Sequence, residues 1–281
     1  MTRPLRWTGV AALVLCCHVS ARAYLPEGRD ILNRMVEHLG LRQNLLVQQQ
    51  LLLYNRGPEQ APVVLKETLR YRFPHGFRSE TLSDPIQKIH LFSHGRAVTV
   101  IDQTVTSTSE GEVDHFKDVL LFNEPDLIWQ RLSDLGVDAD VSSLGRFDGR
   151  IGHVIGAKYP ESSAPQLWVD KKTYRPWRFM IRSMQAESGD LLWEFRYLDW
   201  RQAKKGIRYP YRIEVYRGGR LQQVFQVLAV QADNALPGDL FDIQKLRSRY
   251  REMPSEAMEP DGTDELMELR KSVEDFRRMM E

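Results

Sequence analysis

Histidines four residues apart are the first feature of the sequence that could do chemistry. His90 and His94 occur in the stretch HLFSH. On a β-strand this spacing places both side chains on one face, as two ligands of a metal ion would require. No carboxylate or third histidine follows at the spacing of a metal site. We therefore interpret the pair as part of a solvated strand face and expect no metal ligands.

Other residues with reactive side chains have simpler explanations. His153 alternates with Ile151 and Ile155. This pattern predicts a histidine that points inward and has its hydrogen bonds satisfied there. Asp170 and Lys171 occur in a polar turn, where they serve the hairpin. The sequence contains no serine in a nucleophile elbow and no glycine-rich phosphate loop. We expect no catalytic residues, no cofactor and no enzymatic activity.

Aromatic residues gather on one side of the predicted strands, as an apolar binding site would require. The stretch QLWVDKKTYRPWRFMIR at 166–182 predicts a strand, a turn and a second strand with Trp177, Phe179 and Ile181 on one face. Single bulky rings mostly fill a core, but their shared side would also suit an apolar ligand. The apolar lining predicted in this way comprises eight residues: Tyr71, Phe73, Trp177, Phe179, Trp193, Phe195, Tyr209 and Tyr211.

Alternation of apolar and polar residues predicts the strands that would position these rings. The pattern holds at 65–73, 193–197 and 207–215, and turn signals such as HGR, SGD, KKG and RGGR separate the strands. Short strands in hairpin succession indicate an antiparallel sheet, because parallel neighbours need long crossover connections. With eight or more strands, such a sheet hides its apolar face by curling into a barrel or by stacking on a second sheet.

Helical spacing occurs at three places along the chain. The segment 31–39 has it and stops at Gly40. The segment 116–135 predicts two short helices with a break at Pro125, and together with the first helix they are candidates for a cover over the sheet. Residues 264–281 predict an amphipathic C-terminal helix. Its apolar stripe either packs on the body or binds another periplasmic or membrane protein.

Residues 1–23 predict export from the cytoplasm. Two arginines precede the apolar run WTGVAALVLCC, and Ala21 and Ala23 suit the specificity positions of a cleavage site after Ala23. We therefore expect a mature chain in a bacterial periplasm. Acylation at Cys17 would instead give a lipid anchor, although the residue before the acylated cysteine is normally small and here is a cysteine.

Removal of the export segment changes the charge and the cysteine content. It takes away three of the 39 basic residues and none of the 38 acidic ones, which leaves a net charge of −2. This charge does not indicate nucleic-acid binding. Both cysteines leave as well, so the mature chain has no disulfide, no thiol nucleophile and no cysteine metal ligand. The remaining residues suit one large domain or two small ones.

Three stretches resemble the bacterial outer-membrane lipoprotein-sorting proteins, the LolA/LolB-like periplasmic carriers. The stretch LWVDKKTYRPWRF resembles a hairpin of that family. The stretches GIRYPYRIEVY, with Pro210, and NALPGDLFDI, with Pro237 and Phe241, resemble its later landmarks. The resemblance covers about 147–243, whereas 25–144 agree only in the order of the elements. The tail lies outside the resemblance.

This resemblance implies an α+β fold, a half-open antiparallel β-barrel with covering helices. It would occupy residues 24–245, followed by a polar linker at 246–263 and the helical tail at 264–281. The resemblance also implies a non-enzymatic carrier that shelters the acyl chains of a lipid or lipoprotein during outer-membrane sorting. Shielding each methylene from water is worth about 0.8 kcal/mol, so no covalent chemistry is needed. Two alternatives stay open: an RseB-like regulator that senses lipid or lipoprotein, and a structural or adaptor protein whose barrel is filled by its own side chains.

Overall fold

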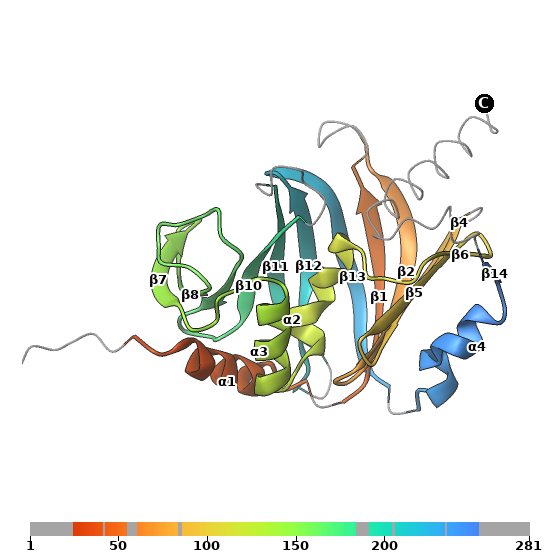
Figure 1. The fold of residues 1–281 in the computed structure, drawn as a ribbon, viewed down its shortest axis with the longest axis horizontal. Helices are drawn as coiled ribbons and strands as arrows, with labels where there is room; N and C mark the ends of the chain where they lie inside the picture. The colour runs from red at the N-terminus through yellow and green to blue at the C-terminus, as the bar shows by residue number, and fades with distance from the viewer. Residues whose placement is uncertain are drawn as a thin grey trace, which may run out of the picture.

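One sheet of 14 strands forms the frame of the protein (Figure 1). The structure is a computed structural model that describes residues 25–41, 43–54, 61–83, 86–183, 191–203, 206–233 and 235–252. The predicted export segment, the predicted C-terminal helix and all but the first residues of the linker lie outside these ranges.

The strands form two groups along the chain, separated by helices. The first group is β1 (Leu45–Leu53), β2 (Val63–Arg72), β3 (Gly76–Ser83), β4 (Ile86–Ser93), β5 (Arg96–Ile101) and β6 (Thr104–Ser107). The second group is β7 (Ser142–Phe147), β8 (Arg150–Ile155), β9 (Gln166–Asp170), β10 (Pro176–Arg182), β11 (Leu192–Gln202), β12 (Arg208–Arg217) and β13 (Arg220–Ala232). A short last strand, β14 (Arg251–Glu252), completes the sheet.

The order of the strands leaves the sheet open. It runs β14-β6-β5-β4-β3-β2-β1-β13-β12-β11-β10-β9-β8-β7, so β14 and β7 are the two edges and do not pair with each other. The neighbours are antiparallel, as hairpin connections favour, except that β14 pairs with β6 in parallel. The predicted half-open antiparallel sheet is confirmed.

Helices cover one side of this sheet. They are α1 (Gly28–Leu39), the 3₁₀ helix η1 (Glu112–Lys117), α2 (Asp118–Leu121) and α3 (Pro125–Asp134), whereas η3 (Gly238–Phe241) and α4 (Ile243–Arg247) pack on the opposite face. Gly40 ends α1 with φ of 61°, a left-handed conformation that glycine adopts without strain. Pro125 is the first residue of α3, where its missing N–H costs nothing. The predicted helices at 31–39 and 116–135 are therefore confirmed. Among the described residues, no helix has both the length and the apolar character needed to cross a membrane.

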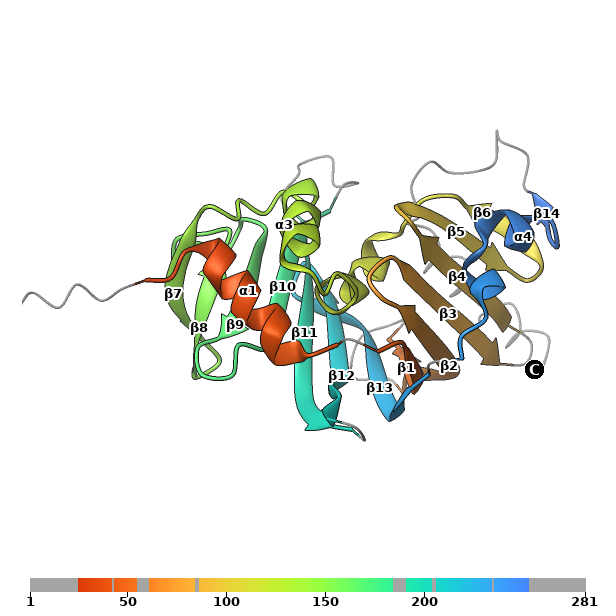
Figure 2. The same cartoon turned by 90° about the horizontal axis from the view of Figure 1, so that it is seen from below.

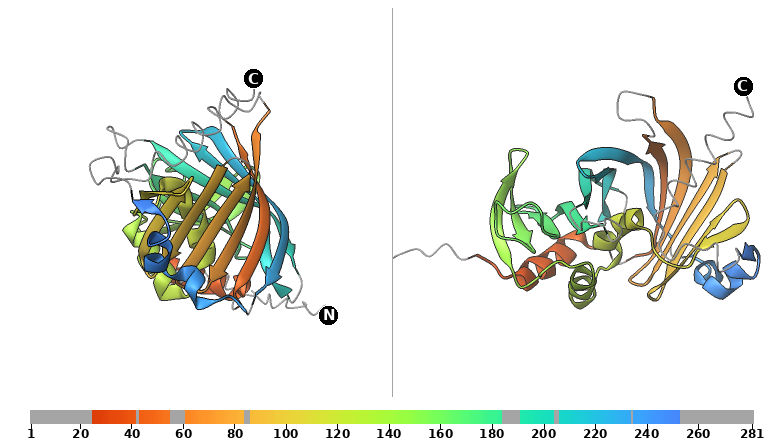
Figure 3. Two further views of the ribbon diagram at one scale, coloured as in Figure 1. Left: turned by 90° about the vertical axis from the view of Figure 1, so that its right-hand side faces the viewer. Right: turned by 45° about the horizontal axis from the view of Figure 1, so that its top comes forward.

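The sheet curves so that its two halves flank the central helices (Figures 2 and 3). Figure 2 shows α1 and α3 lying along the half that contains β8 to β11, with the segment that carries α2 between the two halves. Helix α4 lies on the other face, near β4 and β5. The concave side of the sheet is thus the covered side.

Alternation along the strands divides the buried side chains into three clusters. Leu167 and Val169 belong to the main core on the concave side, whereas Trp168 between them belongs to a small cluster on the opposite face. A further cluster joins the outer side of β4 and β5 to α4. There Leu246 is 3% exposed, so the first residue of the predicted linker at 246–263 is packed against the body.

Candidate functional site

The concave face of the sheet holds most of the residues predicted to line a lipid site. Tyr71, Phe179, Trp193, Phe195 and Tyr209 are buried in the main core. Two more predicted residues, Phe73 and Tyr211, are half-buried and pack against it. Strand alternation therefore brings seven of the eight residues to one apolar cluster. Whether lipid binds there stays a prediction.

Trp177 lies apart from this group, and the expectation that it shares a face with Phe179 and Ile181 is wrong. A β-bulge between Pro176 and Arg178 shifts the register of β10 against β9. The extra residue changes the alternation. As a result, Trp177 packs with Trp168 on the opposite face, with ring centroids 5.6 Å apart.

A segment of the chain itself covers the aromatic concave face. Helices η1 and α2, residues 112–121, contribute Phe116, Val119, Leu120 and Leu121 to the main core. The ring of Phe116 stacks on that of Phe225 with centroids 4.3 Å apart. Figure 1 shows α2 against the inner side of the strands. We call residues 112–121 the plug.

Aromatic side chains of the sheet also anchor the plug by hydrogen bonds. The hydroxyl of Tyr197 donates to the backbone oxygen of Phe116 at 2.9 Å. The carboxylate of Glu112 accepts hydrogen bonds from Trp193 Nε1 and, at 2.7 Å, from Ser183 Oγ. Trp193, predicted to contact lipid, therefore binds the protein's own plug in this structure.

A buried pair of tyrosines lies beside the plug in the same core. The hydroxyl oxygens of Tyr71 and Tyr209 are 2.9 Å apart. Burial raises the pKa of both phenols, and the neighbouring tyrosine raises that of Tyr71 further. Both hydroxyls therefore stay neutral, and the pair is a polar contact inside an otherwise apolar wall.

Buried charges fix the plug to α3. Lys117 and Asp118 have fully buried side chains, and the Nζ of Lys117 binds the carboxylate of Glu110. Arg131 on α3 binds Asp118 Oδ2 and Glu110 Oε2, each at 2.7 Å. Burial alone would raise the pKa of Asp118, but the charges of Arg131 and Lys117 outweigh it and hold that pKa well below its ordinary value. We call Glu110, His115, Lys117, Asp118 and Arg131 the ionic cluster.

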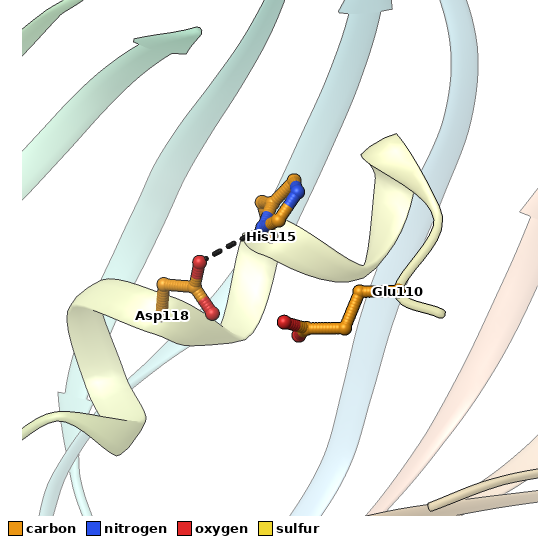
Figure 4. Close-up of side chains that lie close together, drawn as sticks. All are labelled: Glu110, His115 and Asp118. Carbon is orange, nitrogen blue, oxygen red and sulfur yellow. Dashed lines mark hydrogen bonds and ion pairs between the residues drawn. The ribbon is translucent and has the colours of Figure 1, made fainter. Parts of the chain in front are cut away.

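Three members of the ionic cluster have the side chains of a metal site. Ligand atoms of Glu110, His115 and Asp118 lie within 4.8 Å of one another (Figure 4). However, Arg131 and Lys117 already bind both carboxylates. A divalent ion would have to displace two cations that neutralise the site, so these residues fit a salt-bridge cluster better than a metal centre.

A second buried ion pair ties the plug to the first half of the sheet. Asp114 Oδ2 lies 3.4 Å from His90 Nδ1 and accepts a hydrogen bond from the backbone N–H of Gly111. Burial raises the pKa of Asp114, but the positive charges of His90 and Lys88 outweigh this effect and lower it to about 2. His90 is fully buried, so its interpretation as part of a solvated face is wrong; only His94, in the following turn, is exposed.

His153 points inward as predicted but is not satisfied by hydrogen bonds. Its side chain is buried, and within the described residues neither ring nitrogen has a hydrogen-bond partner. The ring stacks on Tyr174 with centroids 5.6 Å apart. Burial lowers the pKa of His153, and the charges of Lys171 and Arg34 lower it further, so the neutral form is favoured.

A polar cleft of about 390 Å³ lies away from the aromatic wall. None of the eight predicted residues lines it; its walls are Gly95, Arg96, Ala97, Thr108, Ser109, Glu110, Ile243, Gln244 and Arg247.

Sequence reasoning predicted a covering helix that begins at Phe116 but missed the first part of the plug, residues 112–115, and its ionic anchors. The segment 110–121, EGEVDHFKDVLL, alternates charged and apolar residues without a clear amphipathic face. A helix that is surrounded by core on all sides has this pattern. Its charged residues then need partners on other segments of the chain. The partner Arg131 lies on a separate helix and could not be identified from spacing.

Comparison with known proteins supports the fold. No protein-family model and no curated protein matches the chain in sequence. Among solved structures, a LolA superfamily protein from Nitrosomonas europaea is similar with a TM-score of 0.52 and 15% identity, over 78% of this chain and 99% of that one. A domain described as an outer membrane lipoprotein-sorting protein, from Vibrio parahaemolyticus, has a TM-score of 0.52 and 12% identity, over 78% of this chain and 97% of that one.

A third similarity is too weak to support an inference. The crystal structure of MucB matches with a TM-score of 0.23 and 16% identity, over 76% of this chain and 62% of that chain. At these identities the comparisons show the fold alone, and the first two establish it.

Proposed function

We propose that this chain, whose fold is LolA-like, binds acyl chains of a lipid or lipoprotein on the concave aromatic face of its sheet. The observation that supports this proposal is the cover of that face. The plug, together with α1 and α3 along the half that contains β8 to β11, covers a wall to which seven of the eight predicted aromatic residues belong (Figure 2). Movement of the plug would expose the part of the wall that it covers, which includes Trp193.

An acyl chain and the plug would gain comparable free energies from burial against the concave wall. Burial of an acyl chain of about 16 carbons gains roughly 12 kcal/mol, at about 0.8 kcal/mol per methylene. The plug buries four apolar side chains, Phe116, Val119, Leu120 and Leu121, worth roughly 6–12 kcal/mol together. An acyl chain can therefore replace the plug without a large loss of apolar burial.

The polar anchors of the plug also permit exchange. Buried ion pairs contribute little net stability, because the attraction mainly offsets the loss of hydration. When the plug moves out, Lys117 and Asp118 regain water. The ionic cluster thus specifies where the plug sits more than it adds to the free energy of closure.

The proposed compartment is the periplasm. This part of the proposal rests on the predicted export segment at 1–23, with cleavage after Ala23 or, alternatively, an anchor at Cys17. In that compartment the acyl chains would belong to lipids or lipoproteins on their way to the outer membrane. The chemistry is binding and release, which requires no cofactor.

Binding of a fluorescent fatty-acid probe to the purified mature protein tests the proposal. Trp193 belongs to the concave wall, and Trp177 lies on the opposite face. A bound probe should quench tryptophan emission with micromolar or tighter affinity. Trp193→Phe should remove most of the quenching, whereas the matched control Trp177→Phe should leave it. Absence of binding by any acyl probe to folded protein overturns the proposal.

Hydrogen exchange tests whether the plug is the moving part. The amides of residues 112–121 should exchange faster than those of β12 around Ile213, and their protection should change when the probe binds. Uniform protection without a response to the probe would instead support a barrel filled permanently by its own side chains.

A further inference from the structure

Two hairpin turns meet at one rim of the sheet, beyond the covered interior. Residues 148–149 join β7 to β8, and residues 171–175 join β9 to β10. The backbone N–H of Lys171 donates to the oxygen of Ile151 at 3.4 Å, so the two turns touch. We call residues 144–151 and 170–175 the tip.

The tip carries exposed cations without ionic partners. Arg146, Arg150, Lys171 and Lys172 are exposed, and none of them forms an ion pair with another described residue. The guanidinium of Arg150 lies over the ring of Trp177, 5.8 Å from its centroid.

The two carboxylates of the tip do not cancel this charge. Asp170 is used inside its own turn, where its Oδ1 accepts hydrogen bonds from the backbone of Lys172 and from the backbone and hydroxyl of Thr173. Asp148 is exposed in the β7–β8 turn. The tip thus has five basic residues, the four exposed ones and the half-buried Arg175, against two carboxylates, a formal excess of three positive charges.

Apolar side chains lie beside Arg146, whereas Arg150 points to the opposite face of the sheet, over Trp177. Ile151 is 44% exposed and lies opposite Arg146 in the β7–β8 pair. Leu144 is 38% exposed and, two residues from Arg146, shares its face of the strand. The surface thus alternates aliphatic and basic groups over neighbouring strands.

Helix α1 adds a further cation beside the tip (Figure 2). Arg34 donates a hydrogen bond to the hydroxyl of Tyr174 at 2.9 Å, and its guanidinium lies 5.4 Å from the centre of that ring. The basic surface therefore continues from the turns onto the exposed side of the helix.

The opposite rim of the same strands has a balanced charge. The connection between β8 and β9, residues 156–165, contains one basic residue, Lys158, and one acidic residue, Glu161. The whole chain has a formal net charge of only +1. The excess of unpaired cations at the tip is therefore a local feature and not a consequence of composition.

We propose that the tip is a docking surface for a bilayer that contains anionic phospholipids. Lysine and arginine near such a surface each gain attraction to the lipid phosphates, which is screened by salt. Ile151 and Leu144 would enter the boundary between headgroups and acyl chains, where exposed aliphatic groups are favoured. This aliphatic component favours a lipid surface over an acidic polypeptide, which would offer these side chains no apolar phase.

Vesicle flotation with the mature protein tests the proposal. The protein should float with vesicles of phosphatidylglycerol and phosphatidylcholine, and not with phosphatidylcholine alone, and salt should weaken the binding. The double variant Lys171→Glu/Lys172→Glu should bind at least tenfold more weakly. The matched control Lys158→Glu/Arg220→Glu, which reverses two exposed charges on the opposite rim, should bind like the wild type.

The measurement also separates docking from the proposed acyl site. All variants should keep the circular dichroism of the wild type and bind the fatty-acid probe equally, because Lys171 and Lys172 are exposed and do not belong to the apolar cluster of the concave wall. Equal flotation with neutral vesicles, or undiminished flotation of the tip variant, overturns the proposal. Binding to poly-glutamate without binding to anionic vesicles also overturns it and assigns the surface to an acidic protein.

Discussion

The two faces of the sheet combine aromatic rings with charged groups at different depths. On the concave face, Lys117 and Asp118 of the plug are completely buried. On the opposite face, Glu214 binds Arg212 at 2.7 Å, and the side chain of Arg212 is 36% exposed. A buried charge loses its hydration and must find a partner in the protein, whereas an exposed one keeps water. The plug charges Lys117 and Asp118 are therefore paired inside the core, whereas the outer face has both a buried pair, Arg178–Glu194, and partly exposed ones such as Arg212–Glu214.

Aromatic rings contact cations on both faces of the sheet. Outside, the guanidinium of Arg178 lies over the ring of Phe147, 4.0 Å from its centroid, and Arg196 lies over Tyr216 at 4.3 Å. Inside, Phe116 meets only other core rings, those of Phe225 and Phe77. Other rings of the main core do have cations over them: Lys117 lies over Phe77 and Phe92, and Arg131 over Phe92 and Phe122. These inner cations belong to the ionic cluster, whereas the outer ones, Arg178 and Arg196, bind Glu194.

Removal of a plug charge should give the largest effect on stability. Asp118→Asn leaves Arg131 and Lys117 buried with one anion fewer. We expect the free energy of unfolding to fall by about 3–5 kcal/mol, as for other broken buried ion pairs. Urea denaturation measures it. Glu214→Gln on the outer face should cost at most about 1 kcal/mol, since its partner is solvated. Equal losses for the two variants would contradict the distinction between the faces.

Acid should destabilise the protein through the plug. The pKa of Asp114 is about 2 in the folded protein, below its ordinary value of 3.8. A carboxyl with a lowered folded pKa contributes stability above its unfolded pKa, and this contribution disappears as the pH falls through the folded value. Stability should therefore drop between about pH 4 and pH 2. Asp114→Asn should flatten this part of the curve, whereas Glu161→Gln, an exposed carboxyl on the opposite rim, should not.

A smaller loss of stability is expected when the Tyr197 hydroxyl that anchors the plug is removed. Tyr197→Phe leaves the buried oxygen of Phe116 without its donor and should lower the free energy of unfolding by about 1–2 kcal/mol. The same change at Tyr216 removes a hydrogen bond to Glu214 on the half-buried outer face and should cost less than about 0.5 kcal/mol. Chemical denaturation of both variants provides the test. A larger loss at Tyr216 would show that depth does not decide the value of these bonds.

The role of the predicted C-terminal helix stays a prediction, as does the alternative that the protein is a regulator that senses lipid or lipoprotein. Deletion from Pro260 onward should leave the melting temperature and the binding of the acyl probe unchanged if the helix serves a partner. A periplasmic pull-down would then lose that partner. A large fall in melting temperature would instead show that residues 264–281 pack on the body.

Local sequence pattern predicted the strands, the helix at 31–39 and the break at Pro125 because these features depend on neighbours along the chain. Alternation also selected seven residues that share the concave face. It failed at Trp177, because a single extra residue in β10 reverses the side on which a ring points. It failed at His90 too, since a polar residue on a strand can find a buried partner such as Asp114 only in the folded chain.

The sequence by itself therefore determined the antiparallel sheet, its aromatic side and the helices available to cover it. Only the tertiary structure decided what lies against that side. The plug is drawn inward by Phe116 and its apolar neighbours, but its charges tolerate burial because Arg131 of α3 and His90 of β4 converge on it and Glu110 of the preceding loop folds back onto Lys117. Such convergence depends on distances across the fold, which spacing along a chain does not record.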